Sequence, residues 1–179
     1  MREALHLNPI GGYLWKFYRI RPSSFPTIRI SQFADLVSHS SNLFSTLLEI
    51  KDAREMEALF DRRASEYWNT HYNFDREVKR STVKRVGKMQ AQMLIINAWV
   101  PLLFVYGTEH GLQHCKDQAM DLLAQLPAED NAVVRTWREM GVEPSNAAES
   151  QALLQLTANF CNNRRCLECG IGYRILKHK

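Results

Sequence analysis

The sequence lacks a run of 18 apolar residues, which is about the length that a membrane-spanning helix needs. Its longest apolar block, Met93 to Tyr106, is interrupted by Asn97 and Pro101. The first residues also lack the charged segment followed by an apolar segment that is typical of a signal peptide. We therefore predict a cytoplasmic protein with no membrane partner.

The sequence also lacks the motifs of common catalytic sites. It contains no glycine-rich phosphate loop and no HExxH, GxSxG or calcium-loop pattern. His71 and Glu66 could form an acid–base pair, but a histidine among aromatic residues more often has a packing role. We assign no catalytic residue and predict that this chain alone is not an enzyme.

Glycine and proline, at 8 and 6 of 179 residues, are too few for a low-complexity segment. No sustained alternation of apolar and polar residues occurs, so we expect little or no sheet. Apolar residues recur instead at helical spacing in residues 28–37, 112–126, 131–140 and 147–161. We predict an all-α fold, an irregular bundle of about six to eight helices around residues 91–106, with a short Cys-containing C-terminal tail.

The predicted organisation has two parts. Residues 1–27 are rich in aromatic and basic residues and contain Pro22 and Pro26, which predicts an extended connector. Residues 28–179 are predicted to form a single helical domain. Within it, residues 88–106 are apolar nearly all round, so we expect the most buried helix there, with a bend near Pro101.

Basic residues are concentrated in three segments, residues 16–29, 75–88 and 164–179, each with a net charge of +4. If folding brings them onto one face, that face would bind a polyanion; alternatively, they are solvated surfaces or pair with acidic segments. Aromatic residues interleave with the cations of the first two segments, as in proteins that stack bases and contact phosphates. The candidate nucleic-acid-binding residues are Arg19, Arg21, Arg29, Lys79, Arg80, Lys84, Arg85, Arg164 and Arg165.

Three cysteines near the C-terminus, Cys161, Cys166 and Cys169, have the spacing C-x4-C-x2-C and lie in a cysteine motif of residues 161–172. Thiolates at this spacing can converge on one metal, and the pattern also matches part of an iron–sulfur run. One prediction is therefore a bound zinc or iron–sulfur cluster, and the others are reduced thiols or a disulfide. The candidates for a fourth ligand are Cys115, His110, His114 and His178.

Five stretches of the sequence resemble a known bacterial family. They are RIRPSSFPTIRISQFADLV (19–37), SEYWNTHYNF (65–74), LIINAWVPLLFVYG (94–107), ESQALLQL (149–156) and FCNNRRCLECGIG (160–172). From about residue 13 onward the chain is similar to the C-terminal half of domain-of-unknown-function family 2851. The resemblance implies longer relatives with a nuclease-like N-terminal half, which is absent here, and a terminal cysteine pattern that the three cysteines match.

The leading hypothesis is a non-catalytic helical accessory domain that binds nucleic acid and is associated with a nuclease-like domain. One alternative is a structural or protein-interaction module, whose partner is a nuclease-like domain or a second copy of the chain. The other is a domain that carries a metal ion or an iron–sulfur cluster through its terminal cysteines.

Overall fold

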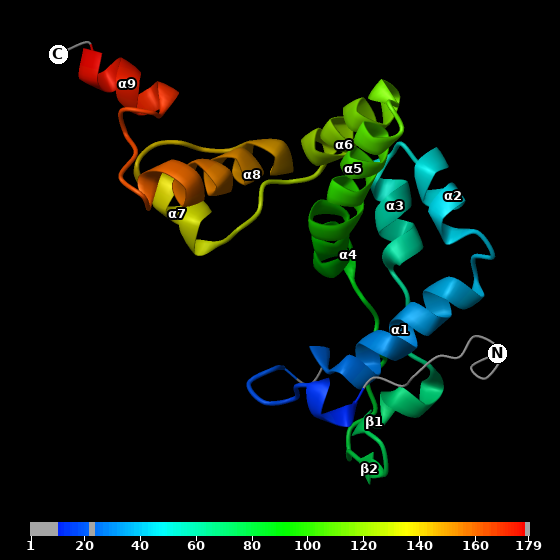
Figure 1. Cartoon of the computed structure of the whole chain (residues 1–179). Helices are drawn as coiled ribbons and strands as arrows, with labels where there is room; N and C mark the ends of the chain where they lie inside the picture. The colour runs from blue at the N-terminus through cyan, green and yellow to red at the C-terminus, as the bar shows by residue number, and fades with distance from the viewer. Residues whose placement is uncertain (1–10, 22–23, 178–179) are drawn as a thin grey trace. The chain divides into compact units, whose positions relative to one another are not determined.

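The structure is a computed structural model that describes residues 11–21 and 24–177 (Figure 1). Helices dominate these residues, and their one sheet is a short antiparallel ribbon of β1 (His71–Asn73) and β2 (Arg76–Glu77). The prediction of an all-α fold is therefore confirmed. The chain divides into two compact units: unit 1 comprises residues 1–47 and 58–91, and unit 2 comprises residues 48–57 and 92–179.

The predicted boundary at residue 27 lies inside unit 1. Two parts of the predicted connector, residues 1–10 and 22–23, lie outside the described residues. In the rest, residues Gly12–Leu14 form a 3₁₀ turn, and helix α1 (Pro26–Ser38) begins at a proline, whose missing N–H has no partner to lose in a first helical turn. The division into a connector and a single helical domain stays a prediction.

The core of unit 1 lies against the buried face of α1. Ile28 packs in a cluster with Ala64 and Trp68, and Phe25 and Tyr72 close it. The 3₁₀ helix η3 (Glu66–Asn69) also belongs to unit 1. Helices α2 (Leu43–Glu49) and α3 (Ala53–Phe60) are each divided between the two units, at residues 47 and 57. Trp68 is only 7% exposed, so it stabilises the fold through its large apolar area rather than by stacking on a ligand.

One long helix combines α4 (Lys88–Leu94), a π-helical turn η4 (Ile95–Trp99) and α5 (Val100–Glu109). In the π turn the Val100 N–H bonds the Ile95 carbonyl, five residues back. Pro101 follows at once, and because it has no N–H it cannot bond the carbonyl four residues earlier. The irregularity therefore falls where the sequence predicts a bend.

This long helix, which the sequence predicts to be the most buried one, exposes part of its apolar surface. Met93, Leu94, Leu102, Phe104 and Val105 are each more than 40% exposed. By length and composition alone the helix could also cross a membrane, a test that core helices of soluble proteins pass as well. The absence of a membrane partner stays a prediction.

In unit 2, α5 packs against α6 (Gln113–Gln125). Helix α6 matches the helix predicted over residues 112–126. Two further helices, α7 (Ala132–Glu139) and α8 (Ala147–Leu156), pack against each other, and each begins with an asparagine whose side chain accepts a backbone N–H. A π-helical turn η5 (Thr157–Cys161) extends α8, and the tail forms α9 (Gly170–Lys177), a helix that the sequence analysis did not predict.

Candidate nucleic-acid interface

The two units carry opposite net charges. Unit 1 contains 13 Lys and Arg residues against 6 Asp and Glu, a formal charge of +7. Unit 2 contains 10 against 13, a formal charge of −3. The excess of positive charge, which the sequence shows as three separate segments, therefore belongs to one compact unit.

Four of the predicted binding residues lie exposed in unit 1 without an ion-pair partner among the described residues. They are Arg19, Arg21, Lys79 and Arg80. Arg19 has a positive φ of 59° and places its guanidinium 5.2 Å from the centre of the Tyr18 ring. Lys79 and Arg80 follow β2, and β2 itself contains Arg76, an exposed cation that was not among the predicted binding residues. Exposed cations of this kind are available to phosphates.

Lys84 is placed differently from the prediction, because its side chain is buried. Its ammonium donates hydrogen bonds to the carbonyls of Trp68 and, at 3.0 Å, Asn69, and it lies 4.2 Å from the centre of the Tyr72 ring. Burial lowers the pKa of this amine. Lys84 therefore holds the η3 segment in place, and its charge is not presented to a ligand.

Arg29 and Arg85 are also engaged within unit 1. The half-buried Arg29 donates to the side chains of Gln32, at 2.8 Å, and Ser24, at 3.3 Å, and burial lowers its pKa. Arg85 makes a two-pronged ion pair with Asp61, with N–O distances of 2.8 and 2.5 Å. The hydrogen bond from Arg85 lowers the pKa of the Asp61 carboxyl. Both arginines are less free to meet phosphates than the exposed cations.

The third predicted segment lies in unit 2. There Arg165 pairs with Glu168, and its Nε lies 3.1 Å from the carboxylate. Arg164 is exposed and has a positive φ of 53°. The hypothesis that these cations share one surface with those of unit 1 stays a prediction.

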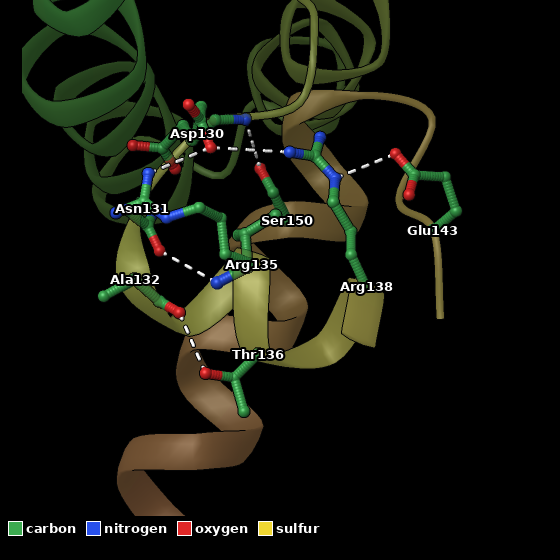
Figure 2. A network of polar contacts seen from close by, with 10 residues as sticks. Asp130, Asn131, Ala132, Arg135, Thr136, Arg138, Glu143 and Ser150 are labelled. Carbon is green, nitrogen blue, oxygen red and sulfur yellow. Dashed lines mark hydrogen bonds and ion pairs between the residues drawn. The ribbon is translucent and has the colours of Figure 1, made fainter. Parts of the chain in front are cut away.

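The arginines of α7 show how unit 2 neutralises its positive charge (Figure 2). Asp130 accepts from Arg135 at 3.2 Å and from Arg138 at 3.5 Å, and Arg138 also bonds Glu143 at 2.8 Å. Exposed ion pairs of this kind contribute little to stability but cancel each other's field. These two arginines are therefore poor candidates for phosphate contacts.

The segment that forms the β1–β2 ribbon also carries aromatic rings. Tyr67 stacks on His71 with ring centres 4.0 Å apart, and its hydroxyl accepts the backbone N–H of Asp75 at 3.2 Å. Phe74, at the turn between the strands, is 66% exposed and packs edge-on against Trp68. The ribbon thus combines exposed rings with cations, the two features that binding of single strands requires.

We call this combination the hairpin patch and define it as Tyr67, His71, Phe74, Arg76, Lys79 and Arg80. Its cationic segment is held by two backbone bonds, from Val78 N to the Thr70 carbonyl at 2.7 Å and from Thr82 N to the Asn69 carbonyl at 2.9 Å. The aromatic–basic alternation in the sequence pointed to this region. Of the two tryptophans in these aromatic–basic segments, Trp68 is buried at 7% exposure, whereas Trp15 is 37% exposed.

The three terminal cysteines differ in exposure: Cys161 and Cys166 are exposed and Cys169 is buried. Among the described residues no group of three or more cysteine, histidine or acidic side chains is placed to hold a metal ion. The backbone here is tight, because Cys169 N bonds the Cys166 carbonyl and Gly172 lies directly against that carbonyl. A zinc or iron–sulfur site at these cysteines stays a prediction.

Comparison with known proteins identifies a family but no characterised relative. No curated protein and no solved structure matches the chain. A family model described as "Protein of unknown function (DUF2851)" matches residues 1–132. That range includes the hairpin patch but ends before the terminal cysteines. The match therefore does not test the resemblance of the cysteine pattern to the family. Because the match spans most of its length, the chain belongs to the DUF2851 family of proteins of unknown function.

Proposed function

We propose that this chain is a non-catalytic helical module that binds single-stranded nucleic acid through the hairpin patch of unit 1. The observation that carries the proposal is the +7 charge of unit 1, with exposed Arg76, Lys79 and Arg80 in the same segment as the exposed rings of Tyr67 and Phe74. Guanidinium and ammonium groups attract phosphates at long range, and ring faces accept bases of any sequence. As the sequence analysis suggests, such a module would serve a nuclease-like domain.

The number of phosphates that the patch neutralises sets the salt dependence of binding. Each phosphate contact on a single strand contributes about −0.7 to the slope of log K against log salt concentration. Replacing all three cations (Arg76→Gln, Lys79→Gln and Arg80→Gln) should therefore make that slope shallower by about 2. Fluorescence anisotropy measures this slope when a labelled strand of about 15 nucleotides, near the upper end of known single-strand site sizes, is titrated at several salt concentrations.

A matched control removes three exposed cations from unit 2, with the variants Lys51→Gln, Arg54→Gln and Arg174→Gln. The net charge of the chain changes equally, but the slope should stay as in the parent chain. Equal slopes for the two triple variants would contradict the proposal, because binding would then follow total charge alone. If a duplex binds as tightly as the single strand, the proposed stacking of bases on the aromatic rings is wrong.

A second candidate function, protein interaction, is favoured by the exposed apolar side of the Lys88–Glu109 helix. The partner that this chain alone can test is a second copy of itself. Under this hypothesis sedimentation velocity shows a dimer whose dissociation constant rises at least about tenfold in the double variant Leu102→Gln and Val105→Gln, since full burial of one such apolar side chain contributes about 1.5–3 kcal/mol. A monomer at all concentrations rules out self-association through this face.

A further inference from the structure

A hollow in unit 1, separate from the hairpin patch, has a lining rich in arginine. It measures about 260 Å³ and is lined by Asp35, His39, Asp61, Arg62, Arg63, Val83 and Arg85. Its lining comes from the C-terminal end of α1 and the residue that follows it, and from two extended segments, one after α3 and one before α4. This volume is just below that of sites for drug-sized ligands. It is several times the volume that one water molecule occupies in the liquid.

The two extended segments hold Arg63 and Arg85 opposite each other. The residues form an isolated antiparallel bridge, flanked by backbone bonds from Ala64 N to the Lys84 carbonyl and from Val86 N to the Arg62 carbonyl, both 2.8 Å. Directly opposed residues of an antiparallel pair project their side chains to the same face. Two like charges in this position destabilise the pair unless an anion lies between them.

The carboxylates of the hollow do not supply enough negative charge. Asp61 is fully used, because it accepts both prongs of Arg85 and the Gly87 N–H at 3.2 Å. Asp35 is partnered by His39, whose Nδ1 lies 3.5 Å from its carboxylate. Arg62 donates a hydrogen bond from its Nε to the Leu59 carbonyl at 2.8 Å, which fixes the side chain. The two terminal nitrogens of its guanidinium remain available to an anion. Arg63 is exposed and has no ion-pair partner among the described residues.

We propose that this hollow is a binding site for a phosphate monoester, held by Arg62 and Arg63 with Arg85 at its edge. Planar guanidinium groups donate two parallel hydrogen bonds to phosphate oxygens, and a dianionic ester matches two otherwise unpaired guanidinium groups. The ester can belong to a free nucleotide or to the phosphorylated end of a strand. The site does not depend on strand binding at the hairpin patch, because the two share no residue.

Arg63→Gln is the decisive variant, because Arg63 contributes its backbone to the bridge and its side chain only to the hollow. Arg85→Gln would be ambiguous, since it also leaves Asp61 without its partner. Isothermal titration of the whole chain with adenosine 5′-monophosphate should show binding that Arg63→Gln weakens about five- to tenfold, the effect of one charge-assisted contact at an exposed site. Arg54→Gln, an exposed cation of unit 2, is the control and should leave the affinity unchanged.

Further arms of the titration separate the sources of the ester. Adenosine without phosphate should not bind, and citrate should bind much more weakly than the monophosphate. An oligonucleotide with a 5′-phosphate should bind more tightly than the same strand with a 5′-hydroxyl, and Arg63→Gln should abolish that difference. A preference for the phosphorylated strand without binding of the mononucleotide assigns the site to strand ends.

Two results would overturn the proposal. One is no binding of any phosphate ester, and the other is equal binding of citrate and the monophosphate. The triple variant of the hairpin patch distinguishes this failure from failure of the proposed function. It should lose strand binding while it retains the mononucleotide, because its three cations lie outside the hollow.

Discussion

Replacing the buried Lys84 by methionine should lower the free energy of unfolding by about 2–3 kcal/mol. Methionine occupies a similar volume, so the loss comes from polar groups rather than from a cavity. The carbonyls of Trp68 and Asn69 lose the ammonium that donates to them, and the ring of Tyr72 loses a cation 4.2 Å from its centre. Unsatisfied buried acceptors are costly, whereas removal of the desolvated charge offsets part of that cost.

Urea titration followed by tryptophan fluorescence measures this loss. Lys79→Met is the matched control, because Lys79 is an exposed lysine of the same unit, and its effect should stay within about 0.5 kcal/mol. The interpretation of Lys84 as a structural residue is wrong if the two variants are equally stable. It is equally wrong if Lys84→Met leaves stability unchanged and only weakens strand binding.

Replacing Gly107 by alanine should destabilise the chain by about 1–3 kcal/mol, the range for forcing extra volume into a packed site. Gly107 is buried where α5 meets α6, and a methyl group there would lie 2.9 Å from both the Cys115 Cβ and the Leu112 carbonyl oxygen. The Leu112 carbonyl cannot move away freely, because the Leu112 N–H bonds Gly107 itself at 2.7 Å. The two helices would have to separate.

Gly170→Ala is the control for this prediction, because a methyl group at Gly170 meets no atom within 4 Å. Thermal unfolding of the two variants should show a clear drop in Tm for Gly107→Ala and almost none for Gly170→Ala. If both behave alike, the close approach of α5 and α6 at Gly107 does not limit stability.

Local signals predicted the helices well where the chain itself marks their ends. The helix predicted over residues 112–126 is observed as Gln113–Gln125, because a stripe of apolar residues is followed by Pro127. Gly107 gave the opposite result: glycine is typical of a helix end, yet α5 continues to Glu109. The sequence alone does not distinguish a glycine that allows close packing of two helices from a glycine that ends a helix.

Contacts between distant residues explain the predictions that the sequence could not make. Lys84 looks like any other lysine of a basic segment, and only its partners 15 and 16 residues earlier make it structural. Arg62 and Arg63 lie outside the three basic segments, so charge counts gave no signal that Arg63 lies opposite Arg85 or that both line the same hollow as Arg85. Composition also could not show which side of an almost wholly apolar helix stays exposed.

The chain passes from one unit to the other three times, near residues 47, 57 and 91. During synthesis, residues 48–57 therefore leave the ribosome ahead of most of unit 2, and residues 58–91 return to complete unit 1. Neither unit can be produced by cutting the gene at a single point, because each is made of two separated stretches. A chain cut after residue 91 would consequently keep residues 48–57 of unit 2 while it lacks residues 92–179, so point variants are the way to study either unit by itself.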